Sequence, residues 1–154
     1  MSPLGCLSNL LKRALVALSV LTLLSLPQFS LAQQAIPVLS GRVIDQTGTL
    51  TASEIGALDQ TLRNFEARKG SQFAVLIVPS TQPESIEQFA IRVADQWKIG
   101  RKKIDDGVIL IVAKSDRKLR IEVGYGLEGA LTDATSKRII DQVIVPRFKQ
   151  QNFY

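Results

Sequence analysis

Two β-prone apolar runs with an amphipathic segment between them most constrain how this chain can fold. The runs are Phe73–Val78 and Val108–Val112, and each is apolar at consecutive positions, as a strand covered on both faces requires. The apolar residues of the intervening segment recur at helical spacing, namely Ile86, Phe89, Val93 and Trp97. A strand, a helix and a strand in this order form a right-handed crossover, so the two strands are expected to run parallel.

A hairpin is expected to follow the second run. Apolar and charged residues alternate over Leu119–Val123, which is typical of a strand with one wet face. The link Ala113–Lys118 is short and polar, so this strand is expected to pair antiparallel with the one before it. Such pairing places Gly124–Gly126 beside Asp105 and Asp106.

The remaining segments predict two more helices and an extended arm. Residues 51–54 match a capping box, and Gly70 provides a left-handed end, so a helix is expected between them. Its apolar stripe is Ile55, Leu58, Leu62 and Phe65. Residues 33–48 are expected to form an extended arm that packs on the domain.

The other helix boundaries are less sharply defined. The helix between the two runs has two capping registers, from Thr81 or from Ser85, and Gly100 is expected to close it. A third helix is capped by Thr132 or Asp133 and is expected to bury Ile139, Ile140, Val143 and Ile144. These elements predict a three-layer α/β/α sandwich whose small mixed sheet combines a parallel βαβ unit with an antiparallel hairpin.

Residues 1–32 have the form of a secretory signal peptide. Lys12 and Arg13 precede the apolar stretch 14–26, and Ser30-Leu31-Ala32 offers small residues at the −3 and −1 positions of a cleavage site. The alternative, an uncleaved anchor, is disfavoured because a membrane span needs roughly 20 apolar residues. The mature domain is therefore expected to comprise residues 33–154 and to be exported, either periplasmic or on the outer face of the membrane.

Composition excludes several kinds of chemistry. The sequence contains no histidine, and its one cysteine, Cys6, lies in the predicted signal. Thiol catalysis, Ser-His-Asp triads and ordinary zinc sites are therefore excluded from the mature domain. Signal removal lowers the net charge from +5 to +3, and with no basic patch interleaved with aromatic residues, no nucleic-acid partner is expected.

One rim of the predicted sheet gathers acidic and glycine residues. Asp105 and Asp106 are the candidate catalytic residues, and with Asp133 they are the candidate metal ligands. Gly124 and Gly126 are the candidate binding residues, because glycines let backbone amides approach an anion closely. Carboxylate oxygens suit Ca²⁺ or Mg²⁺, and no organic cofactor is expected.

The same residues also have a purely structural interpretation. Asp-Asp-Gly before a strand is a common turn, and Gly-Tyr-Gly is also explained by backbone geometry. Asp133 is equally suited to capping a helix. The basic residues Arg101-Lys102-Lys103 are interpreted as a solvated turn.

Several motifs in order resemble the TPM domain family. They include Trp97-Lys98-Ile99-Gly100, Asp106-Gly107-Val108-Ile109-Leu110, Gly124-Tyr125-Gly126-Leu127-Glu128, Leu131-Thr132-Asp133 and Pro146-Arg147-Phe148. The resemblance implies an α/β/α sandwich outside the cytoplasm. It also implies that Asp105, Asp106 and Asp133 match acidic positions that bind divalent cations in lumenal relatives.

Two functions follow as expectations from this resemblance. The first is an exported module, non-catalytic or weakly catalytic, that binds an envelope or membrane protein and acts in membrane-complex assembly or repair. The alternative is a metal-assisted acid phosphatase, although the chain has no Asp-x-Asp motif and no histidine to protonate a leaving group. Many bacterial members continue past the position of Tyr154, often into a membrane helix. Both a complete domain and a fragment of an anchored chain fit the pattern.

Overall fold

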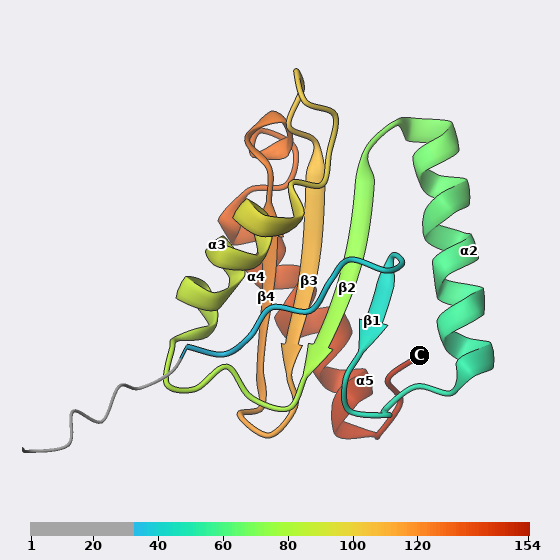
Figure 1. Cartoon of the computed structure of the whole chain (residues 1–154). Helices are drawn as coiled ribbons and strands as arrows, with labels where there is room; N and C mark the ends of the chain where they lie inside the picture. The colour runs from blue at the N-terminus through green and yellow to red at the C-terminus, as the bar shows by residue number, and fades with distance from the viewer. Residues whose placement is uncertain (1–32) are drawn as a thin grey trace, which may run out of the picture. The chain divides into compact units, whose positions relative to one another are not determined.

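A four-stranded mixed sheet forms the centre of the computed structural model, which describes residues 33–154 (Figure 1). Its strands lie in the order β1 (Val43–Asp45), β2 (Gln72–Val78), β3 (Gly107–Ala113) and β4 (Lys118–Val123). The first three run parallel, and β4 pairs antiparallel with β3. The parallel crossover and the hairpin predicted from the sequence are both confirmed. The predicted signal peptide lies outside the described residues.

Helices cover both faces of the sheet (Figure 1). They are α2 (Ala52–Lys69), α3 (Ile86–Trp97), α4 (Asp133–Ile139) and α5 (Val145–Lys149), with a 3₁₀ turn at Tyr125–Leu127 and a π-helical turn at Ile140–Ile144. The predicted α/β/α sandwich is confirmed. In residues 33–154, no helix combines the length and the apolar character that crossing a membrane requires.

Two apolar clusters, one on each face, hold the layers together. On one face α3 packs against alternate residues of β2 and β3, and Phe89 and Val93 of α3 are completely buried. On the other face α2 and the C-terminal segment pack on the opposite side chains of the same strands. Alternation of side chains along a strand explains why each run had to be apolar on both faces.

The N-terminal arm is more ordered than the sequence indicated. Its residues 43–45 pair with β2 and form an edge strand, where only an extended arm was predicted. Before that strand the arm crosses α3, where the Trp97 side chain donates a hydrogen bond to the carbonyl of Pro37 at 2.9 Å. Ile36 packs on the α3 cluster.

The structure decides between the two alternative caps of two helices and corrects two other details of the prediction. Ser85, not Thr81, caps α3, and Lys98, not Gly100, takes the left-handed conformation that ends it. Thr132 caps α4, so Asp133 is its first residue. The π-helical turn shifts the register after Ile139, and this leaves Val143 about half exposed, although it was expected to be buried.

Replacement of the α3 cap tests its contribution to stability. The Ser85 hydroxyl accepts from the Gln88 amide at 3.2 Å, while the Gln88 side chain accepts from the Ser85 amide. Ser85→Ala is expected to lower the free energy of unfolding by about 0.5–2 kcal/mol in a urea titration. A midpoint equal to that of the wild type would contradict the assigned cap.

Candidate functional site

The end of β4 lies against the turn that precedes β3, as the sequence predicted. The amide of Gly124 donates to the carbonyl of Gly107 at 2.8 Å, and the amide of Gly126 donates to the carbonyl of Asp105 at 2.9 Å. Between them the Tyr125 amide donates to the Asp105 carboxylate at 3.0 Å. All three amides therefore have partners within the protein, which argues against the anion-binding role predicted for Gly124 and Gly126.

Close backbone contact explains these two glycines instead. A Cβ atom at Gly124 would overlap the carbonyl oxygen of Asp105, and one at Gly126 would overlap the carbonyl oxygen of Ile104. Only glycine lets the chain pass this close to the preceding turn. Both residues shape the site by packing.

Both carboxylate oxygens of Asp106 accept hydrogen bonds from Arg101. Its side chain is 2% exposed, and one oxygen accepts from Nε and Nη2 of Arg101 at 2.9 and 2.6 Å. The other oxygen accepts from the backbone amide of Arg101 at 2.8 Å. Side-chain and then backbone hydrogen bonds from Arg101 lower the pKa of Asp106, so the carboxylate stays ionised.

This pairing changes the interpretation of both residues. Arg101, predicted to lie in a solvated turn, holds the carboxylate that was proposed as a ligand and catalyst. A metal or a substrate would have to displace a two-point guanidinium contact to reach Asp106. The sequence weakly indicated this ion pair, because Arg101 and Asp106 lie five positions apart on either side of one predicted turn.

Asp105 is exposed, and its carboxylate accepts from the Tyr125 amide and takes no part in the Arg101–Asp106 pair. Its backbone is left-handed with φ of 55°, a conformation that aspartate tolerates better than most residues. It lines a cleft of about 800 Å³ together with Glu122 and Glu128. Adjacent positions in the sequence thus place Asp105 in the cleft and Asp106 in the interior.

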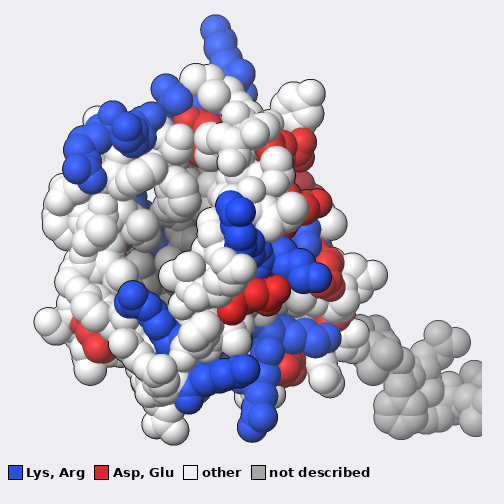
Figure 2. Space-filling view, turned by 180° about the vertical axis from the view of Figure 1, so that it is seen from behind, with Lys and Arg blue, Asp and Glu red and all other residues white. Residues whose placement is uncertain are grey.

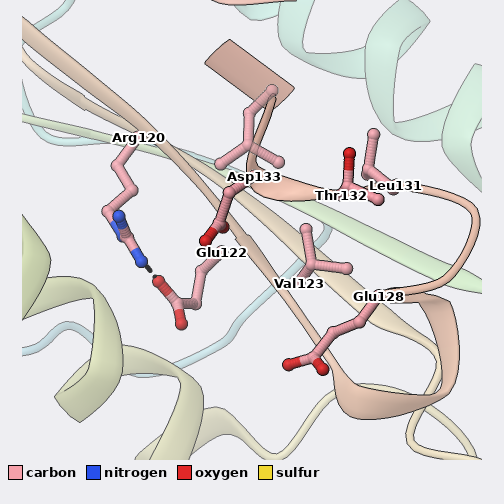
Figure 3. A pocket seen from close by; sticks show the side chains of 8 residues that line it. Arg120, Glu122, Val123, Glu128, Leu131, Thr132 and Asp133 are labelled. Carbon is pink, nitrogen blue, oxygen red and sulfur yellow. Dashed lines mark hydrogen bonds and ion pairs between the residues drawn. The ribbon is translucent and has the colours of Figure 1, made fainter. Parts of the chain in front are cut away.

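Asp133 lies in a second cleft of about 380 Å³, alongside β4 (Figure 3). Glu122 and Glu128 line this cleft as well, so they border both. Figure 3 shows the Asp133 carboxylate directed toward the ion pair between Arg120 and Glu122, whose atoms lie 2.7 Å apart. Glu128 lies on the turn at the other end of the cleft.

The three predicted metal ligands are not brought together. In residues 33–154, no three acidic side chains are arranged so that they would hold a metal ion. Asp106 is paired, and Asp105 and Asp133 face different clefts. Arg120 and Glu122 were predicted only as the wet face of the hairpin strand, not as site residues. Both residues lie at the charged positions of an alternating strand. That pattern is the same for a face exposed to solvent, so it did not indicate a cleft.

Loss of the Asp106 carboxylate is expected to destabilise the fold. Asp106→Asn removes the charge partner of Arg101 at a buried position, and a lowering of the free energy of unfolding by about 1–3 kcal/mol follows. Chemical denaturation measures it. The matched control is Asp105→Asn, whose exposed side chain should cost much less. Equal effects of the two variants would contradict the assignment.

The same pair predicts a dependence on pH. Because Arg101 lowers the pKa of Asp106 from its ordinary value of 3.8, the unfolded chain takes up the proton more readily than the folded one. The pair's contribution is complete above about pH 4 and is lost as the pH falls further. The difference in stability between the wild type and Asp106→Asn should shrink when denaturation is repeated at about pH 3. A difference independent of pH would contradict the pairing.

Comparison with known proteins places this geometry in a family. The family model of the TPM domain matches residues 43–154. Among solved structures, the N-terminal domain of a protein from P. gingivalis is 34% identical, with a TM-score of 0.66, and the match covers 74% of this chain and 73% of that one. The N-terminal domain of the cg2496 protein from Corynebacterium glutamicum shares the fold at 15% identity, with a TM-score of 0.58 over 82% and 79% of the two chains.

A search of the curated proteins found no match. The family match spans every described strand and all four helices. The chain therefore belongs to the TPM domain family.

Proposed function

We propose that this chain is an exported TPM module of the bacterial envelope that binds a partner protein and assists the assembly or repair of membrane complexes. The observation that carries the proposal is the bonding of Asp106. The carboxylate best placed by sequence to act in catalysis is buried and bound to Arg101. Binding a partner protein does not require a free carboxylate at Asp106, so the pairing with Arg101 is compatible with that role.

The protonation state of Asp106 supports the same conclusion. A general acid or base works best when its pKa lies near the working pH. Arg101 moves the pKa of Asp106 the opposite way, below its ordinary value. Histidine, the usual alternative, is missing from the sequence.

Binding of Ca²⁺ or Mg²⁺ belongs to the proposal as a secondary property. Asp105 and Glu128 offer exposed carboxylate oxygens to one cleft, and Asp133 offers another to the neighbouring cleft. Hard cations prefer such oxygens. The arrangement does not fit a preformed metal centre, so weak binding is proposed, without participation of Asp106.

A metal-assisted acid phosphatase is the second candidate. The observation in its favour is the cleft that Asp105 shares with Glu122 and Glu128, where several carboxylates border one open space. Lys98 and Arg101 line the same cleft, and cationic groups would attract a phosphate.

An activity assay separates the two candidates. The purified domain 33–154 is incubated with para-nitrophenyl phosphate at acid and neutral pH, with Ca²⁺, with Mg²⁺ and with chelator. We expect no phosphate release above the protein-free blank. Release that requires a cation and is lost in Asp105→Asn or Asp133→Asn, but not in the exposed control Asp141→Asn, would establish the phosphatase instead.

Cation binding is measured separately, by NMR titration of the same variants with CaCl₂. Shifts at the amides of residues 124–128 are expected in the wild type and in a folded Asp106→Asn variant. Asp105→Asn should weaken them. Shifts that vanish only in Asp106→Asn would reverse the assignment of ligands.

Export is tested on the full chain. Expression in a bacterial host followed by N-terminal sequencing of the secreted or periplasmic product is expected to yield Gln33 as the first residue. Recovery of the uncleaved chain in the membrane fraction would indicate an anchor instead.

A further inference from the structure

The two edges of the sheet differ in length. β1 forms one edge with three residues, and β4 forms the other with six. An edge strand presents backbone donors and acceptors that another extended chain can pair with. The β4 edge is the longer of the two and offers more such groups.

The hydrogen bond from Gly124 to Gly107 sets the phase of the hairpin. These residues lie opposite each other in the register that pairs Val108 with Val123. Hydrogen-bonded pairs alternate in an antiparallel ladder, so the backbone groups of Lys118, Arg120 and Glu122 face β3. Those of Leu119, Ile121 and Val123 face outward. Within residues 33–154, no hydrogen bond from outside the hairpin reaches them.

The cleft of about 380 Å³ runs along this edge (Figure 3). Four consecutive strand residues, 120–123, form one side of it, and Glu128 with the segment 131–133 forms the other. An open groove therefore lies beside the outward-facing backbone of β4.

The charge of the groove indicates what it would bind. Glu122, Glu128 and Asp133 line it, and Arg120 is the opposing cation, already paired with Glu122. In the view from behind, acidic side chains gather mainly on the side where β4 and α3 lie, interspersed with cationic ones (Figure 2). An approaching lysine or arginine gains from this excess of negative charge.

We propose that the β4 edge binds an extended segment of a partner protein that carries lysine or arginine, by adding it to the sheet as a fifth strand. The inference rests on the proposed function, because it identifies how the module would hold its partner. Backbone groups of Leu119, Ile121 and Val123 pair with the segment and supply affinity. Alternate side chains of the segment face Glu122, Glu128 and Asp133, which select for positive charge.

A defined peptide tests the proposal. The probe is an acetylated and amidated seven-residue peptide in which lysine alternates with valine, added to the ¹⁵N-labelled domain 33–154. We expect saturable amide shifts concentrated at Leu119, Ile121 and Val123. The same peptide with glutamate for lysine, or methylated at its five central amide nitrogens, should bind at least tenfold more weakly.

Variants of the edge separate backbone pairing from charge. Ile121→Pro removes an outward N–H and leaves the ladder to β3 intact, so it should abolish binding, whereas Ile121→Val should retain it. The combined change Glu122→Gln, Glu128→Gln and Asp133→Asn should weaken binding at least tenfold and keeps the test valid if the proline variant fails to fold. The control is Asp141→Asn, which lies outside the groove.

Four outcomes would overturn the inference. They are absence of binding by the lysine peptide, equal binding of the N-methylated peptide, shifts that map away from β4, and a dimer that pairs β4 with β4 and excludes the peptide, as seen by sedimentation. The phosphatase assay remains independent of these outcomes. Phosphate release would refute the proposed function, whereas an inert domain that binds no peptide would refute this inference alone.

Discussion

The contact between Arg101 and Asp106 is the interaction on which the rest of the rim depends. The carboxylate accepts from the backbone and the side chain of Arg101, so it closes the turn that leads from α3 into β3. That turn presents the carbonyls of Ile104 and Asp105 to the end of β4, and Gly126 packs directly on them. Without a fixed turn, neither the strand end nor the clefts beside it would have a defined position.

The pattern of apolar residues predicted most of the fold, but it did not predict β1 or the π-helical turn. Consecutive apolar residues identified β2 and β3, because a strand that is buried on both faces is apolar at nearly every position. β1 was missed because three residues cannot show a period, and its pairing with β2 depends on tertiary contacts. The π-helical turn at Ile140–Ile144 likewise leaves no trace in a helical stripe, since one shifted hydrogen bond changes which residues face inward.

The site was predictable in position but not in chemistry. Pairing of the hairpin placed Asp105 beside Gly124, and that followed from register alone. Which carboxylates remain free did not follow, because it depends on where Arg101 reaches. Glu122 escaped notice for a related reason: on one strand, a charged residue that lines a cleft and one that is merely solvated have the same pattern.

The N-terminal arm contacts the apolar clusters on both faces of the sheet. Ile36 packs on the α3 cluster, and Val43 packs within the α2 cluster on the opposite face. The segment from Ile36 to Val43 thus contacts both apolar clusters, and Arg92 holds the start of the arm by donating to the carbonyl of Gln34 at 2.7 Å. This linkage favours cooperative unfolding of the two layers as one unit.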